Sequence, residues 1–195
     1  MDMRKISEEV KNYLQESLKI AEYQTGLKDS IIEVSQEMQN AINSGGKIIF
    51  CGNGGSAADA QHLAAELVVR FKENRNPIPA LSLTTDTSVI TSIGNDFGFD
   101  LIFSRQLEAV GNKEDFLVVI TTSGKSQNII EAVKQANEMD IKVLTLAGSD
   151  TSLLEEGSSY IISIPSDVTG VIQQAHITIG QIFCKILELN IINHK

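Results

Sequence analysis

The sequence predicts an α/β fold in which helices cover both faces of a parallel β-sheet. Five short runs rich in β-branched and apolar residues recur between residues 47 and 164, and segments with helical spacing separate them. The runs are almost continuously apolar, as expected of strands that are buried on both faces. Strands and helices that alternate in this way form a three-layer sandwich with the sheet in the middle.

The elements can be placed in order along the chain. Apolar residues recur at helical spacing from 5 to 44 with an interruption at 25–27, which predicts two leading helices. The strands are expected at 47–51, 80–83, 116–120, 142–146 and 160–164, and a long closing helix at about 168–190. We expect a single domain over residues 1–195, with a helical lead-in at about 5–44 and an α/β core at about 46–192.

Composition excludes several classes of function. The chain has 195 residues, of which 42% are hydrophobic, and 16 Lys and Arg stand against 25 Asp and Glu, so its formal net charge is −9. An acidic chain repels a phosphate backbone, which argues against direct nucleic-acid binding. The two cysteines have no metal-site spacing, and no run approaches 18 apolar residues, so we expect a cytoplasmic protein without a membrane partner.

A glycine-rich loop, Gly52-Asn53-Gly54-Gly55-Ser56, follows the first predicted strand. Its backbone can approach an anion closely, and Ser56 can cap the helix that follows, so a phosphate or a sugar oxygen is the expected guest. The loop also fits the dinucleotide pattern G-x-G-x-x-A. The acidic residue expected about 20 positions later is missing, however, and no nucleotide cofactor is expected. The alternative is a tight turn that needs glycine for its geometry alone.

A second loop with hydroxyl groups follows the third predicted strand, with the sequence Thr121-Thr122-Ser123-Gly124-Lys125-Ser126. Its hydroxyls, its glycine and the start of the next helix form a second anion cradle, to which Lys125 could add a positive charge. A P-loop would need a glycine at position 119, which is Val119, so a nucleotidase is not indicated. The alternative is an ordinary helix cap.

His62 and Glu66 lie four residues apart on the helix after the glycine-rich loop. Residues at this spacing share one face of a helix, and the pair would suit a divalent metal or acid–base chemistry. The alternative is a solvated surface pair. Two anion cradles on one sheet favour a phosphorylated ligand near this pair.

Five motifs together give the chain a close resemblance to the sedoheptulose 7-phosphate isomerases, a group within the sugar isomerase (SIS) domain family. They are Cys51–Leu67 (CGNGGSAADAQHLAAEL), Leu83–Ser88 (LTTDTS), Ile93–Gly98 (IGNDFG), Phe103–Gln106 (FSRQ) and Thr122–Ser126 (TSGKS). The resemblance covers about residues 28–190. It implies a flavodoxin-like sandwich, a homotetramer with active sites between subunits, and ketose-to-aldose isomerisation that yields a heptose 7-phosphate for bacterial heptose biosynthesis.

The same resemblance implies roles for individual residues. It makes Glu66 the base that takes a carbon-bound proton next to the carbonyl. Phosphate would bind at Thr121, Thr122, Ser123 and Ser126, and the sugar at Asn53, Gly54, Gly55, Asn95 and Asp96, with Ser56 and Gln173 also in the substrate site. A zinc ion in many members is held by the equivalents of His62, Glu66, Gln173 and a histidine that corresponds to Gln181.

The closing helix departs from the family pattern at three positions. An Arg, a Glu and the catalytic His of the family are replaced by Val171, Gln174 and Gln181. Glutamine cannot exchange a proton at neutral pH, and loss of a general acid or base costs about 10²- to 10⁴-fold in rate. His176 lies roughly 140° from Gln181 around a helix, so it is expected to pack or to form an interface rather than replace the missing group.

Three functions remain open on the sequence alone. The first is a phosphoheptose isomerase in which Glu66 is the base and Gln181 or water relays the second proton. The second is a non-catalytic adaptor for the bacterial replication initiator, favoured by the loss of the histidine at 181. The third is a sugar-phosphate-binding protein that has kept the two cradles and lost the chemistry. Of the three, the isomerase is the main expectation, with a sugar-phosphate substrate and a homo-oligomer as its partners.

Overall fold

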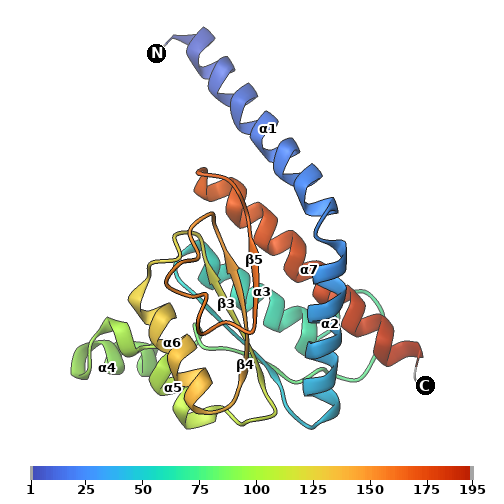
Figure 1. Ribbon diagram of the computed structural model, residues 1–195, viewed down its shortest axis with the longest axis vertical. Coiled ribbons are helices and arrows are strands. Elements are labelled where there is room, and N and C mark those ends of the chain that lie inside the picture. Colours follow the sequence, from blue (N-terminus) through green and yellow to red (C-terminus); the bar gives the residue numbers. More distant parts are fainter. Residues whose placement is uncertain (1, 194–195) are drawn as a thin grey trace.

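Five parallel strands form one sheet in the order β2-β1-β3-β4-β5 (Figure 1). The computed structural model describes residues 2–193. The strands are β1 (Ile48–Gly52), β2 (Ala80–Ser82), β3 (Phe116–Thr121), β4 (Lys142–Ala147) and β5 (Tyr160–Ser163). This is the flavodoxin-like order of a doubly wound sheet, and it confirms the predicted fold class.

Helices cover both faces of the sheet, as the apolar strands predict. They are α1 (Met3–Thr25), α2 (Lys28–Asn43), α3 (Gly55–Val68), α4 (Thr87–Asp96), α5 (Ser104–Val110), α6 (Gln127–Glu138) and α7 (Thr169–Asn193), with a 3-10 turn η1 at Phe99–Leu101. Side chains alternate along each strand. Phe116, Val118 and Ile120 face the core beneath α2, α3 and α7, whereas Leu117 and Val119 face the core beneath α5 and α6.

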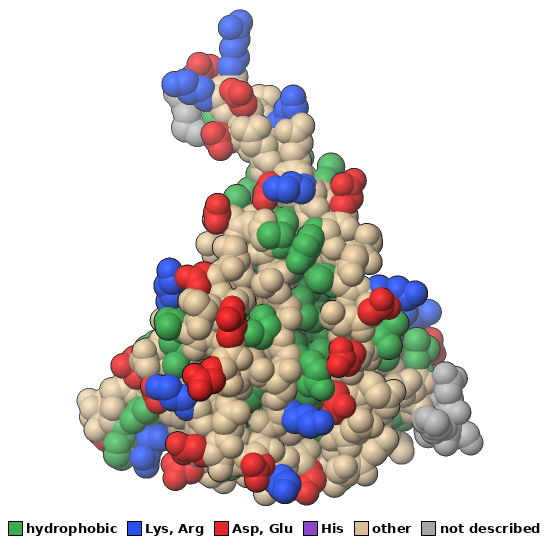
Figure 2. All heavy atoms as spheres, viewed as in Figure 1, with side chains coloured by type: hydrophobic (Ala, Val, Ile, Leu, Met, Phe, Trp, Pro, Cys, Tyr) green, Lys and Arg blue, Asp and Glu red, His purple; other side chains and the backbone are tan. Residues whose placement is uncertain are grey.

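The two leading helices differ in how much they bury. Helix α2 lies on the body and buries Ile31, Val34 and Met38, but α1 buries only Ile20 and projects away from the body (Figure 1). Figure 2 shows charged side chains of both signs at the tip of α1 and hydrophobic side chains where it meets the body. Helix α1 also packs against α7, but Val10, Leu14 and Leu18 stay exposed, so part of its apolar surface has no partner among the described residues.

Helix α7 is the core helix of one layer. Its residues Thr169–Ile192 are long and apolar enough, by length and composition, to cross a membrane. The helix instead packs against α3, α2 and α1, and Ile179, Phe183 and Leu187 are buried there. A buried helix of this kind is apolar around most of its circumference because neighbours surround it.

Strands β1 and β3 are neighbours in the sheet, so their carboxyl ends lie side by side. Gly52 at the end of β1 is paired with Ile120 in β3, one residue before the second loop begins. The topology therefore brings the two predicted anion-binding loops to the same edge, where ligands of doubly wound sheets bind.

Candidate active site

The glycine-rich loop after β1 turns the chain sharply into α3. Gly54 has φ of +56°, a left-handed conformation that favours glycine, and the first residue of the helix is Gly55. The expected cap at Ser56 is wrong, because the N-cap position falls on Gly54 and Ser56 lies inside the first turn. Ser56 is buried, so its hydroxyl faces the protein. The exposed groups of this loop are Gly54 and Gly55.

The loop after β3 is shaped by its own hydroxyl groups. The Thr121 hydroxyl accepts a hydrogen bond from the Gly124 N–H at 3.2 Å, and the Ser123 hydroxyl accepts one from the Lys125 N–H at 3.2 Å. Ser126 is the N-cap residue of α6, and its side chain makes no capping bond there. The helix N-terminus beside these groups is a favourable place for an anion.

Lys125 is not a free cation at this loop. Its ammonium group lies 2.9 Å from the Asp150 carboxylate, and that contact, with bonds from Ser152, lowers the pKa of Asp150 to about 2. Gly124 backs onto the same segment, because a Cβ at this position would come within 1.9 Å of the Asp150 carbonyl oxygen. The lysine therefore pairs with Asp150 on the surface of the loop.

A pair of amide side chains joins the two loops. Asn53 Nδ2 donates to Asn128 Oδ1 at 2.8 Å, and Asn128 Nδ2 donates back to Asn53 Oδ1 at 3.0 Å. Asn128 is buried in the first turn of α6. Sequence reasoning did not select Asn128, although a polar residue just after a hydroxyl-rich loop was a usable signal. The pair fixes the glycine-rich loop relative to the hydroxyl-rich loop.

His62 and Glu66 contact one another as their spacing predicts. His62 Nε2 lies 3.1 Å from Glu66 Oε1, with 48% of the histidine side chain and 24% of the glutamate side chain exposed. Both side chains can therefore meet a ligand from solvent while α3 holds them at a fixed separation. A carboxylate beside an imidazole is suited to moving protons.

Helix α7 brings one of its two predicted site residues against the first loop. A Cβ on Gly55 would come within 2.4 Å of the Gln173 amide nitrogen, so Gln173 packs directly on the start of α3. Gln181 is two turns further along α7 and half-buried. Gly180 beside it packs on the Leu63 side chain of α3.

His176 has the packing role that the sequence predicts. Its side chain is fully buried, and Nε2 contacts the Ala147 carbonyl oxygen at 3.0 Å. Because a carbonyl can only accept, Nε2 carries the proton in the neutral ring. Burial lowers the pKa of His176 to about 4, although the bond to Ala147 raises it slightly. A buried neutral histidine of this kind takes no part in the site.

Asn95 and Asp96 do not join the other predicted site residues. They lie at the exposed end of α4, where Asn95 Nδ2 donates to Asp96 Oδ1 at 2.7 Å. Within residues 2–193, no hydrogen bond connects either residue to the loop after β1. Their expected contact with the sugar therefore remains a prediction, because the single chain does not bring these two residues to the other site residues.

The donor atoms fit a zinc centre poorly. Among the described residues, no group of three or more His, Cys, Asp and Glu side chains could hold a metal. His62 and Glu66 are the two customary zinc ligands of the predicted set, and Gln173 and Gln181 offer only neutral amide oxygens.

Comparison with known proteins decides the family. A model of the SIS domain matches residues 12–148. A phosphoheptose isomerase from Campylobacter jejuni is 45% identical over 89% of this chain and 94% of its own length, and one from Akkermansia muciniphila is 47% identical over 83% and 85%. The chain belongs to the phosphoheptose isomerase family of SIS-domain proteins.

Solved structures of this family agree with the fold. A phosphoheptose isomerase from Neisseria gonorrhoeae superimposes with a TM-score of 0.87 at 38% identity, over 94% of this chain and 98% of that one. One from Francisella tularensis gives 0.87 at 35% identity, over 97% and 99%. The resemblance inferred from the five sequence motifs is therefore confirmed, and so is the fold that it implied.

Proposed function

We propose that this chain is a phosphoheptose isomerase. It interconverts sedoheptulose 7-phosphate and D-glycero-D-manno-heptose 7-phosphate, an aldose–ketose isomerisation that serves bacterial heptose biosynthesis in the cytoplasm. The observation that carries the proposal is the Asn53–Asn128 pair, because it ties an anion-binding loop to the loop that leads into the His62–Glu66 helix. Relatives at 45–47% identity with this name support the choice of substrate.

The chemistry follows from groups on the chain itself. The substrate phosphate binds the hydroxyl groups after β3, and the sugar carbons reach back towards α3. The Glu66 carboxylate takes the proton from the carbon next to the carbonyl, the electron pair forms a carbon–carbon double bond, and the carbonyl oxygen gains a proton. A proton then returns to the former carbonyl carbon. The hydroxyl group on the carbon that Glu66 deprotonated loses its own proton and becomes the new carbonyl.

The second proton cannot come from Gln181 itself. An amide does not ionise at neutral pH, so Gln181 can hold a water molecule or a substrate oxygen while the water moves the proton. His62, 3.1 Å from Glu66, keeps the carboxylate oriented during both transfers. We expect turnover to be slower than in relatives with a histidine at this position.

The test is isomerisation of sedoheptulose 7-phosphate by the purified chain, with and without zinc, beside the Gln181→His variant. The proposal predicts turnover in the parent and faster turnover in the variant. An inactive parent with an active variant would instead support a sugar-phosphate-binding protein that has lost its chemistry.

The assembly that goes with this function is a homotetramer. On α1, the exposed apolar side chains are Met3, Val10, Tyr13, Leu14, Leu18 and Tyr23, and Val68 and Val69 are exposed at the end of α3. A second copy is the natural partner for such surfaces in a symmetric oligomer. Sedimentation should show an oligomer at micromolar concentration, and deletion of residues 2–19 should reduce its size. A parent that sediments as a monomer would contradict the assembly.

A further inference from the structure

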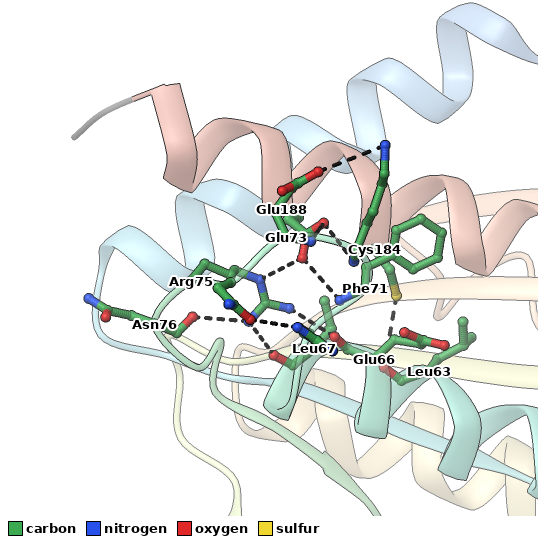
Figure 3. Close-up of polar contacts among 12 residues, drawn as sticks. Leu63, Glu66, Leu67, Phe71, Glu73, Arg75, Asn76, Cys184 and Glu188 are labelled. Carbon is green, nitrogen blue, oxygen red and sulfur yellow. Dashed lines mark hydrogen bonds and ion pairs between the residues drawn. The ribbon is translucent and has the colours of Figure 1, made fainter.

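A buried carboxylate at the far end of α7 holds the segment that follows α3. The two oxygens of Glu188 accept hydrogen bonds from the backbone N–H groups of Phe71, Lys72 and Glu73, at 3.0, 2.9 and 3.1 Å (Figure 3). Burial by itself would raise the pKa of Glu188. These three bonds and the Arg75 guanidinium lower the pKa by more than burial raises it, so the net shift is downward. The group is therefore a charged carboxylate inside the protein.

Arg75 connects this carboxylate to α3. Its Nε lies 3.3 Å from Glu188 Oε1, and both side chains are almost completely buried. Its Nη2 donates to the Glu66 carbonyl oxygen at 2.8 Å, and its Nη1 donates to that of Leu67 at 2.8 Å (Figure 3). The last four carbonyl groups of a helix lack partners within it, and a cation there is favourable, so Arg75 acts as a side-chain cap of α3.

The contact between α3 and α7 continues from this cap towards the centre of both helices. One turn before Glu188, Cys184 Sγ donates to the Leu63 carbonyl oxygen at 3.8 Å. Another turn earlier, Gly180 packs against the Leu63 side chain. The ion pair therefore closes one end of the interface between the helix with Glu66 and the helix with Gln173 and Gln181.

We propose that Arg75 and Glu188 are positioning residues for Glu66. They hold the backbone of the last turn of α3 against α7, so that the Glu66 carboxylate keeps its place relative to the bound sugar. The inference rests on the proposed function, since it assigns these residues to the reaction for which Glu66 is the base. Misplacing a reacting group by 1 Å can cost about 100-fold in rate, so a rigid backbone here matters for the chemistry.

Two variants test this proposal. Glu188→Gln keeps the size of the side chain and removes its charge. Arg75→Lys keeps the buried charge but removes the fork that reaches two carbonyl groups of α3, and it supplies a second test should Glu188→Gln fold poorly. The control is Glu37→Gln, which removes an ion pair with Lys142 elsewhere on the surface.

The expected result separates positioning from general stability. At a temperature where all proteins are folded, both variants should lose at least about tenfold in kcat with KM within about twofold of the parent, because the phosphate loops are untouched. The control should keep the parent kcat. Amide hydrogen exchange at Phe71, Lys72 and Glu73 should become at least about tenfold faster in Glu188→Gln, since these N–H groups lose a charged acceptor.

The two possible failures are distinguishable. A parent without turnover would refute the proposed function, and the positioning role would fall with it. A parent with turnover, beside two folded variants that keep its kcat, would refute the positioning role alone. A rise in KM at constant kcat would also refute it, because the residues would then act on substrate binding rather than on the placement of the base.

Discussion

Replacing His176 by glutamine should remove much of the acid sensitivity of the fold. The ring is fully buried, and its Nε2 contacts the Ala147 carbonyl oxygen at 3.0 Å. Burial lowers the pKa of His176 from 6.5 to about 4. Between these two values the unfolded chain binds a proton that the folded chain does not, so stability falls as the pH falls.

The size of the effect follows from the pKa difference. One pKa unit corresponds to 1.36 kcal/mol. The buried ring therefore lowers the free energy of unfolding by about 3 kcal/mol as the pH falls from 6.5 to 4. Glutamine can still donate to Ala147 and does not titrate in this range. The His176→Gln variant should therefore have about the parent stability at pH 7 and lose about 3 kcal/mol less than the parent at pH 4.

Urea unfolding at a series of pH values, at one protein concentration, measures this difference. His62→Gln is the matched control, because 48% of the His62 side chain is exposed. The free energy of unfolding of this control should depend on pH almost as steeply as that of the parent. Equal pH dependence in the parent and the His176→Gln variant would show that His176 is not held neutral by burial.

Three further predictions concern the site. Asn128→Ala leaves Asn53 without its reciprocal partner, so we expect a rise in KM for the sugar phosphate of about tenfold, measured by steady-state kinetics; an unchanged KM would contradict the bridge. Gly55→Ala should leave the melting temperature almost unchanged but lower kcat/KM at least about tenfold, because its Cβ would displace the flexible end of Gln173; unaltered kinetics would place Gln173 outside the site. Gln181→His should bind zinc more tightly than the parent by titration calorimetry, since imidazole is the stronger ligand; equal affinity would contradict the expected ligand set.

Much of the fold could be predicted from the sequence because its strands are buried on both faces. A run such as Phe116–Ile120 is apolar at every position, which indicates burial on two sides, and the structure extends that strand only to Thr121. The closing helix was expected at about 168–190 and is observed at Thr169–Asn193. The spacing of His62 and Glu66 also predicts their contact, because residues four apart on a helix lie on the same face.

Other features depend on tertiary contacts that no local pattern carries. Ser56 had the right chemistry for a cap, but the chain turns at Gly54 and the helix begins at Gly55, two residues earlier than that role requires. Glu188 has the appearance of an ordinary acid near the end of a helix, and its partner Arg75 is more than a hundred residues away in the sequence. Asn128 likewise acquires its role only when β1 and β3 become neighbours.

The proposed role of Glu66 is to remove a carbon-bound proton from a heptulose phosphate. The most direct measurement is turnover of sedoheptulose 7-phosphate in deuterated water by the parent and by Glu66→Gln, with deuterium in the product followed by mass spectrometry. We expect that the parent forms the aldose with deuterium at the carbon next to the carbonyl, and that the variant loses at least about 100-fold in rate. A variant that forms deuterated product at the parent rate would contradict it.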